Sequence, residues 1–324
     1  MHLNATGLSV LVLEGAEHAV PTVASLLGDG ASVTVRAPSV CTALQDLAQR
    51  GHLRWTRDEV DEGSFDLVVR HLARPVARES AGATTGRVTL VGAGPGDPGL
   101  VTVAGRAAIE TADVVVADRL APWEALAWAP AHAEVVDVSK IPFGRSTSQD
   151  EINRILVDHA TAGRHVVRLK GGDSYVFGRG FEEVQACAAA GIATTVIPGV
   201  TSSVAAPELA GVPVTHRGLV QGFTVISGHV PPGHPDSTID YAALARSGTT
   251  LVVLMGVRTL PAITEALLDA GLDGGTPCAL VADASLAGQR SLRTTLAKAA
   301  SDAATAGIGA PAVAVIGHVA ALEP

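Results

Sequence analysis

Short apolar runs alternate with helix-like stretches along most of this chain. From residue 87 onward nine runs predict strands, because each is rich in aliphatic residues and is bounded by turn-forming or charged residues. The runs are RVTLVG, ADVVVAD, AEVVDV, HVVRLK, TTVIPG, FTVISG, TLVVLMG, CALVAD and AVAVIG. Nine strands are too many for one small sheet, so we expect two α/β lobes that divide near residues 204–222, with a ligand cleft between them.

The first part of the chain predicts a smaller α/β unit. Residues 8–13 form an apolar run typical of a buried strand, 21–27 has a helical pattern, and 32–35 predicts a second strand. The stretch RPVARESAGATTG has no apolar period and is rich in arginine and small residues, as linkers are. We therefore expect a small Rossmann-like domain at 1–73, a linker at 74–86, and lobes at 87–210 and 211–324.

Composition supports this α/β class and limits the partners. Hydrophobic residues make up 47% of the chain and aromatic residues only 3%, so the core must consist mainly of Ala, Val and Leu, as in sheets covered by helices. The formal net charge of -9 argues against a nucleic-acid partner, because phosphate binding needs a clustered basic surface. An anionic ligand must therefore be bound by locally placed Arg or Lys side chains.

The N-terminal residues and the cysteine positions argue against a membrane protein, a disulfide-linked protein and a metal site. The start MHLNATGLSVLVLEG lacks the basic residues and cleavage site of a signal peptide, and no apolar run reaches the length of a membrane span. Cys41, Cys187 and Cys278 lie far apart, without the C-x-x-C spacing of a zinc or redox site. We expect a cytoplasmic protein with buried thiols.

The first glycine-rich loop, 92–99, directly follows the strand RVTLVG. It departs from the dinucleotide fingerprint G-x-G-x-x-G, because Asp97 stands in place of the third glycine and Pro95 and Pro98 remove amide donors. This loop therefore argues against NAD as a cofactor. A tight structural turn is the alternative to a ligand-binding loop.

Two further loops follow strands in the same way. After HVVRLK, Gly171 and Gly172 would expose backbone groups to a ligand, and Asp173 could accept hydrogen bonds from a ribose or an ammonium group, or simply brace the turn. After TTVIPG, Thr201 or Ser202 could cap the next helix, contact a ligand, or do both. All three loops are candidates for one binding site.

These loops, with the phrases VADRL, VSK, RLKGGD, VFGRG, PGVTSS and VPVTHRG in this order, resemble the tetrapyrrole methylase family. The resemblance covers roughly residues 87–321, and the phrases RLKGGDSYVFGRG and THRG favour the branch that methylates uroporphyrinogen III. It implies a two-lobed α/β fold with S-adenosyl-L-methionine in the interlobe cleft. It also implies two methyl transfers that yield precorrin-2 by way of precorrin-1, S-adenosyl-L-homocysteine as the second product, and a homodimer.

The resemblance carries the family's cofactor contacts to particular positions. They are Pro95, Gly171, Gly172, Asp173, Val176, Thr201, Ser202, Met255 and Thr294. The family usually has glycine where Thr294 stands, proline where Ser174 stands and alanine where Ser202 stands. Without the resemblance, Met255 would be assigned to core packing.

The resemblance also implies the reacting groups: Asp118 as the base and Lys140 as the acid. Taken alone, these two residues would be a helix cap and a solvated strand end. Uroporphyrinogen carries eight carboxylates, so Arg119, Arg179 and Arg217 are candidates to bind it, because the planar guanidinium can pair bidentately with a carboxylate. Ordinary surface charge or internal bracing is the alternative for each arginine.

Residues 8–72 resemble the first half of the NAD-dependent precorrin-2 dehydrogenase module of fused sirohaem synthases, through VLVLEGAEHA, LLGDGASVTV and GHLRW. The glycine cluster of that module is broken, since Glu14 and Ala16 flank Gly15, and a carboxylate there would repel a pyrophosphate. We predict a truncated domain without dehydrogenase activity. The alternatives are a bifunctional methyltransferase and dehydrogenase, a methylase acting on a later precorrin, and a non-catalytic tetrapyrrole-binding or cofactor-binding regulator.

Overall fold

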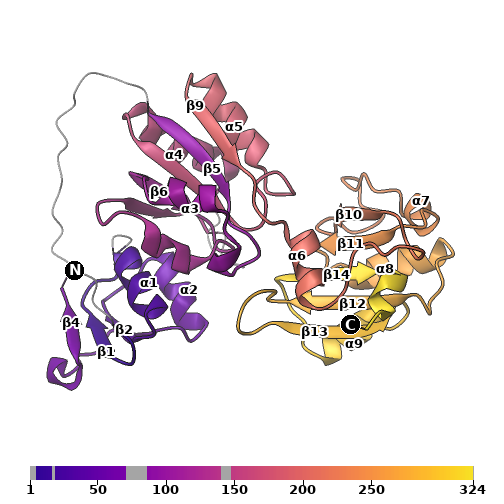
Figure 1. Ribbon diagram of the computed structural model, residues 1–324, viewed down its shortest axis with the longest axis horizontal. Coiled ribbons are helices and arrows are strands. Elements are labelled where there is room, and N and C mark those ends of the chain that lie inside the picture. Colours follow the sequence, from indigo (N-terminus) through magenta and orange to yellow (C-terminus); the bar gives the residue numbers. More distant parts are fainter. Residues whose placement is uncertain (1–4, 17–18, 71–85, 140–146, 324) are drawn as a thin grey trace. The chain divides into compact units, whose positions relative to one another are not determined.

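The computed structural model describes residues 5–16, 19–70, 86–139 and 147–323. The chain forms two compact units, one of residues 1–94 and 98–199 and the other of residues 95–97 and 200–324. Figure 1 shows the elements of each unit, coloured along the sequence. Within the described ranges, no helix combines the length and the hydrophobicity needed to cross a membrane.

The first unit begins with a small parallel sheet in the order β3-β2-β1-β4. Its elements are β1 (Ser9–Val12), α1 (Val20–Gly28), β2 (Ser32–Arg36), α2 (Thr42–Gln49), β3 (Arg54–Thr56), the 3₁₀ helix η2 (Glu62–Ser64) and β4 (Leu67–Val69). The central strand β1 pairs on both sides, with Val10 opposite Val33 and Leu67. The predicted strand–helix–strand start is confirmed. Except for Gly86, the predicted linker at 74–86 lies outside the described residues.

The main sheet of the first unit is parallel throughout, in the order β7-β6-β8-β5-β9. Its strands are β5 (Arg87–Gly92), β6 (Val114–Ala117), β7 (Glu134–Asp137), β8 (His165–Lys170) and β9 (Ala193–Ile197), and its helices are η3 (Pro98–Leu100), α3 (Val103–Ile109), η4 (Trp123–Trp128), α4 (Gln149–Thr161) and α5 (Gly180–Ala189). Neighbouring residues of one strand enter different cores, as Val166 and Val167 do in β8. Helices must therefore cover both faces, which is why these strands are rich in aliphatic residues.

The small N-terminal sheet and the main sheet of this unit share one hydrophobic core. Val20, Val23 and Ala24 of α1 belong to the same buried cluster as Ala125 and Leu126 of η4, and α1 packs along η4. The N-terminal domain is thus a packed part of the first unit. This contact buries apolar surface on both sides, the main favourable contribution to such a docking.

The second unit is a mixed sheet in the order β10-β11-β14-β12-β13, in which β10 and β11 are parallel and the other pairs antiparallel. Its elements are α6 (Ser202–Leu209), β10 (Phe223–Ser227), α7 (Tyr241–Ala245), β11 (Thr250–Leu254), α8 (Leu260–Asp269), β12 (Pro277–Ala282), β13 (Arg290–Thr295), α9 (Ala299–Thr305), β14 (Ala312–Ile316) and the 3₁₀ helix η5 (His318–Ala321). All nine predicted strands are present. Among the described residues from 86 onward, the strand that was not predicted is β13, an edge strand whose sequence RSLRTT contains no apolar run.

The division between the units falls at Gly199 rather than at the boundary of 210 and 211 expected from the sequence. Helix α6 belongs to the second unit because Ala206 is buried against Val252, Val281 and Val313 of its sheet. The sequence pattern placed the boundary at the glycine and proline after this helix, whereas packing of the helix decides which sheet it joins.

Candidate active site

Three glycine loops meet at the carboxyl ends of the neighbouring strands β8, β5 and β9. Gly94 and Gly172 exchange two backbone hydrogen bonds, of 3.1 and 2.6 Å. A Cβ atom on Gly199 would collide with the carbonyl oxygen of Gly172 and lie 2.5 Å from the carbonyl carbon of Gly92. Glycine is therefore required where the loop backbones touch each other. These contacts show that the loops are tight structural turns, which was the alternative to a ligand-binding role. The candidate site lies on these turns.

Asp173 ties two of these loops together. Its Oδ1 atom accepts a hydrogen bond from the amide of Tyr175 at 2.8 Å, and its Oδ2 atom accepts one from the amide of Gly199 at 3.0 Å. The bracing role considered for this carboxylate is thus present. Each carboxylate oxygen can accept more than one hydrogen bond, so bracing leaves capacity for a ligand. Val176 follows in the same loop and is half-buried.

Asp118 comes directly after β6 and lies beside the Gly171 loop. Its Oδ1 atom accepts hydrogen bonds from the amides of Leu120 at 3.2 Å and Gly171 at 3.4 Å. Its Oδ2 atom is 3.4 Å from Nη2 of Arg168, and its side chain is 28% exposed. The carboxylate is thus held by these donors and remains partly exposed. Lys140, the predicted acid, lies outside the described residues.

A buried group of charges lies behind Asp118, and sequence reasoning missed it. Arg168 and Lys170 of β8 both pair with the Oε1 atom of Glu183, at 3.0 and 3.1 Å. Burial, and next the charge of Arg168, hold the pKa of Lys170 below its ordinary value. The signal was present in HVVRLK, because charged residues at alternate positions of a strand buried on both faces need buried partners.

The three candidate arginines differ in their surroundings. Arg179 pairs with Glu182 through Nε at 2.8 Å and Nη2 at 2.6 Å. Arg119 and Arg217 make no hydrogen bond or ion pair with another residue in the described parts of the chain. Arg217 is exposed on a turn that backbone hydrogen bonds between His216 and Val220 close. Their assignment to substrate binding stays a prediction.

The remaining cofactor candidates lie in the second unit. Thr201 caps α6, its hydroxyl accepting from the amide of Ser203 at 3.3 Å, and Ser202 is the first residue of that helix. Met255 is 49% exposed and has a left-handed φ of 56°, so it does not serve as core packing. Thr294 donates its hydroxyl hydrogen to Asp302.

Pro95 belongs to the short segment 95–97 that packs with the second unit. The amide of Asp97 donates to Oγ of Ser285 at 2.8 Å, which attaches this segment to the loop after β12. Pro95 itself is half-buried. The structure thus divides the predicted cofactor residues between the two units, four in the first and five in the second.

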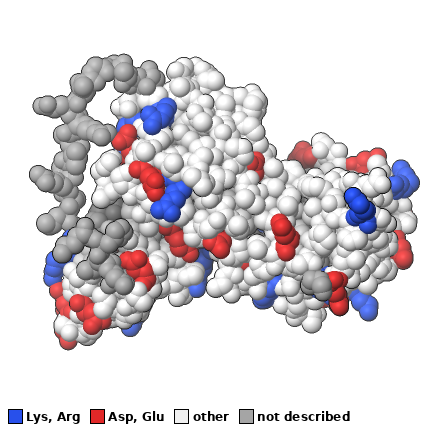
Figure 2. Space-filling view, in the orientation of Figure 1, with Lys and Arg blue, Asp and Glu red and all other residues white. Residues whose placement is uncertain are grey.

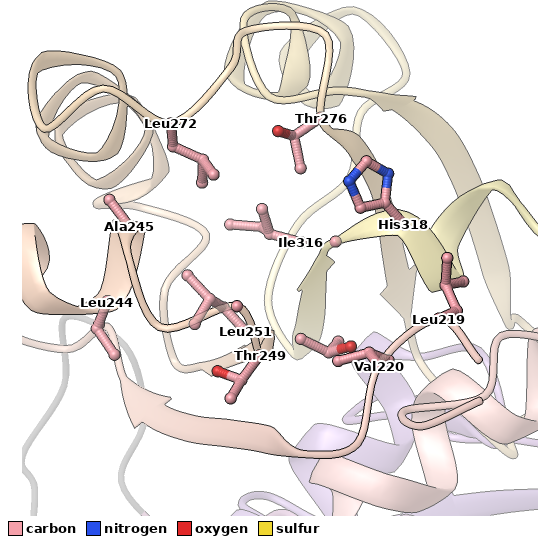
Figure 3. A pocket seen from close by; sticks show the side chains of 13 residues that line it. Leu219, Val220, Leu244, Ala245, Thr249, Leu251, Leu272, Thr276, Ile316 and His318 are labelled. Atoms are coloured by element: carbon pink, nitrogen blue, oxygen red, sulfur yellow. The ribbon is translucent and has the colours of Figure 1, made fainter. Parts of the chain in front are cut away.

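Two pockets lie away from these residues. The pocket in Figure 3 is lined mostly by aliphatic side chains around the start of β11, at Thr250 and Leu251, whereas Met255 follows the other end of that strand. A second pocket lies at the ends of β1 and β2, in the N-terminal domain. There a Cβ atom on Gly15 would collide with the carbonyl oxygen of Ser39. The chain's own loop therefore covers the glycine that a dinucleotide would approach.

Figure 2 shows Lys and Arg dispersed as separate residues on the face drawn, whereas several Asp and Glu side chains gather at its lower left. The described residues of this face therefore form no basic patch that an anionic ligand would need.

Comparison with known proteins identifies the family. The model of the Tetrapyrrole (Corrin/Porphyrin) Methylases matches residues 87–300. The chain is a tetrapyrrole methylase. The predicted family and fold class are thereby confirmed.

Relatives and solved structures agree with this assignment. The methylase is 44% identical to the S-adenosyl-L-methionine-dependent uroporphyrinogen III methyltransferase of Methanosarcina barkeri, over 74% of this chain and 93% of the relative. It is 43% identical to the uroporphyrinogen-III C-methyltransferase of Pseudomonas aeruginosa, over 72% and 94%. The uroporphyrin-III C-methyltransferase of Thermus thermophilus, solved with S-adenyl homocysteine, has a TM-score of 0.62 and 42% identity, covering 72% of this chain and 98% of that one.

Proposed function

We propose that this tetrapyrrole methylase transfers two methyl groups from S-adenosyl-L-methionine to carbon atoms of uroporphyrinogen III, giving precorrin-2 by way of precorrin-1. The names of relatives that match over more than nine-tenths of their length support the substrate and the cofactor. The observation that carries the proposal is Asp118, a partly exposed carboxylate held beside the glycine loops by Arg168. The product is a precursor of sirohaem and cobalamin.

The chemistry asks the protein mainly for positioning and for proton transfer. The sulfonium of the cofactor supplies an activated methyl group, and alignment of two reactants can lower a barrier by roughly 7–11 kcal/mol. Methylation of a pyrrole carbon requires protons to be rearranged, for which we assign Asp118 as base and Lys140 as acid. Asp118 suits this role because two amides and Arg168 fix its orientation while one side stays open.

Each unit contributes its own proposed cofactor contacts. Those of the first unit are Gly171, Gly172, Asp173 and Val176, and those of the second are Pro95, Thr201, Ser202, Met255 and Thr294. The close glycine packing and the exposed, left-handed Met255 support this set, because strained and exposed residues of this kind concentrate at ligand sites. The hydroxyl of Thr294 donates to Asp302, so this residue would contact the cofactor through other atoms.

For the substrate carboxylates we propose Arg119, Arg217 and Arg179. The first two make no ion pair within the described ranges, so a substrate carboxylate can take that place at little cost. Arg179 would have to exchange Glu182 for the substrate. Its guanidinium is half-exposed, which makes such an exchange accessible.

We further propose that the N-terminal domain has no NAD-dependent dehydrogenase activity. The loop after β2 lies against Gly15, where the amide of Cys41 donates to the carbonyl oxygen of Gly15 at 2.7 Å, and Glu14 adds a carboxylate nearby. A pyrophosphate would meet this loop in place of free amides. The domain instead packs α1 on η4 of the methylase.

We also propose a homodimer in the cytoplasm. Large apolar side chains are exposed near the glycine loops, with Tyr175 and Phe181 in edge-to-face contact at 5.8 Å and Phe177 42% exposed. Clustered exposed aromatic residues are typical of surfaces that contact another protein.

Mass spectrometry of the tetrapyrrole tests the function. Purified protein is incubated anaerobically with uroporphyrinogen III and S-adenosyl-L-methionine, with and without NAD. We expect a gain of two methyl groups, no further oxidation when NAD is added, and loss of the gain in Asp118→Asn. Oxidation with NAD would establish the bifunctional alternative. Methylation of a later precorrin alone, or cofactor binding without any methylation, would favour the other two alternatives.

A further inference from the structure

Glu183 is a carboxylate with no solvent exposure, placed in the first turn of α5. Its Oε1 atom accepts hydrogen bonds from Nε of Arg168 at 3.0 Å, Nζ of Lys170 at 3.1 Å and Nε2 of Gln149 at 3.3 Å. Its Oε2 atom has no hydrogen-bond partner among the residues that the structure describes. A buried charge of this kind is costly unless it is paired, so its two cationic partners are the reason it is tolerated.

Arg168 extends this contact from α5 to Asp118. Its Nη1 atom donates to the carbonyl oxygens of Val116 at 3.2 Å and Leu169 at 3.0 Å, and its Nη2 atom lies 3.4 Å from Oδ2 of Asp118. The guanidinium therefore donates to backbone carbonyl oxygens of β6 and β8 and to the carboxylates of Glu183 and Asp118. Its planar form permits few other orientations once these partners are fixed.

The turn between the glycine loop and α5 determines where Glu183 lies. The amide of Gly180 donates to the carbonyl oxygen of Ser174 at 3.0 Å. A Cβ atom on Gly178 or on Gly180 would lie 2.6 or 2.5 Å from that oxygen, and Arg179 between them has a left-handed φ of 57°. The VFGRG phrase is thus a tight turn that starts α5 at a defined place, with Glu183 directed towards β8.

The positive charges of Arg168 and Lys170 are matched by two carboxylates only when Asp118 is counted with Glu183. Arg168 and Lys170 are two buried cations, with side chains 3% and 5% exposed, and Glu183 is one buried anion. Asp118, at the open edge, supplies the second negative charge. The network holds the carboxylate of Asp118 from behind and leaves its other side to solvent.

We propose that Glu183 is a positioning residue for methyl transfer, which fixes Arg168 and, through it, the carboxylate of Asp118. Glu183 has no exposed surface and so cannot touch the substrate itself. The proposal rests on the proposed function, because it assumes that Asp118 acts in methyl transfer.

The test compares Glu183→Gln with Glu110→Gln. Glu110, at the end of α3, is 46% exposed and pairs with Arg106 at the surface at 2.8 Å, and neither of these two residues belongs to the proposed site. We expect Glu183→Gln to lower kcat by about 10- to 100-fold, the effect of misplacing a reacting group, while the KM for S-adenosyl-L-methionine stays within about threefold of the parent value. Glu110→Gln should keep the parent kcat. A folded Glu183→Gln protein with the parent kcat would overturn the proposal.

A double variant separates positioning from charge compensation. Lys170→Met with Glu183→Gln removes one buried charge of each sign, so we expect the unfolding midpoint to return towards that of the parent. The kcat should stay low, because Arg168 still lacks the carboxylate of Glu183. Recovery of kcat together with stability would show that Glu183 only neutralises Lys170, which also overturns the proposal.

Crystal structures of the parent and of Glu183→Gln examine the same step without an assay. We expect the Arg168 guanidinium to shift and its contact with Asp118 to be lost. An unchanged contact would refute the positioning role whatever the substrate is. Absence of methylation by the parent protein and by Glu110→Gln would instead refute the proposed function, so the two failures are distinguishable.

Discussion

Replacement of Gly199 by alanine tests the close packing of the three loops. The new Cβ atom would lie 2.5 Å from the carbonyl carbon and 2.6 Å from the Cα atom of Gly92, where an ordinary contact is 3.4–4 Å. Both atoms belong to backbone, so the loops must separate by about 1 Å. This movement also strains the hydrogen bond from the Gly199 amide to Asp173.

The expected loss of stability follows from these two effects. Overpacking costs about 1–3 kcal/mol, and a hydrogen bond to a charged group contributes about 1.5–3 kcal/mol. Because the loops can relax in part, we expect the free energy of unfolding of Gly199→Ala to fall by roughly 3 kcal/mol, or about 100-fold in the folding equilibrium. S-adenosyl-L-homocysteine should bind at least about tenfold more weakly, because the Gly172 backbone moves with the contact.

Gly28→Ala is the matched control. Gly28 ends α1, its φ is not left-handed, and a Cβ atom there would meet nothing within 4 Å. We expect a gain of about 0.5–1 kcal/mol, from the lower entropy of the unfolded chain. Guanidinium unfolding and calorimetric titration with S-adenosyl-L-homocysteine measure both variants. A Gly199→Ala protein as stable as the parent, with unchanged affinity, would show that the loops do not touch as described.

Three further predictions concern single side chains. In steady-state kinetics, Arg217→Gln should raise the KM for uroporphyrinogen III several-fold and leave the KM for S-adenosyl-L-methionine unchanged. Arg246 is also exposed, and Arg246→Gln should alter neither KM. Burial lowers the pKa of His165 from its ordinary value of 6.5. The contribution of this residue to stability is therefore fully present above pH 6.5 and is lost as the pH falls below that value, because the unfolded chain then binds a proton that the folded chain does not. The urea midpoints measured at about pH 5.5 and at about pH 7.5 should differ less in His165→Gln than in the parent protein. Burial raises the pKa of Cys278 to about 12 and also raises the pKa of Cys187. Because Cys41 is the partly exposed cysteine of the three, a disulfide reagent should modify only Cys41 in the native protein, and rapid reaction of Cys278 would contradict its burial.

Most of the fold could be predicted from local pattern. The nine strands from residue 87 onward follow from apolar runs bounded by turn residues, because a strand buried on both faces is rich in aliphatic residues. Strand β13 could not be found in this way. It lies at a sheet edge, so RSLRTT needs no apolar face and its pairing with β12 is a long-range event.

The candidate site shows a similar division. The family phrases indicated Asp118 and the Gly171 loop, and the structure brings these two together at 3.4 Å. Glu183 was absent from the prediction, because its residue type and position in a helix look like those of its exposed neighbour Glu182. Only the placement of α5 against β8 shows that one glutamate is buried on two cations and the other pairs at the surface.

The sequence by itself determined the family, the order of the elements and the residue types at the loops, because these depend on contacts close along the chain and on motifs. The tertiary structure alone decided which glycines touch, which unit takes α6, and which charges are buried together. Such facts depend on atoms that are far apart in sequence, like Gly92 and Gly199 or Arg168 and Asp118. Their interaction energies exist only after the sheets have formed and water has left the interior.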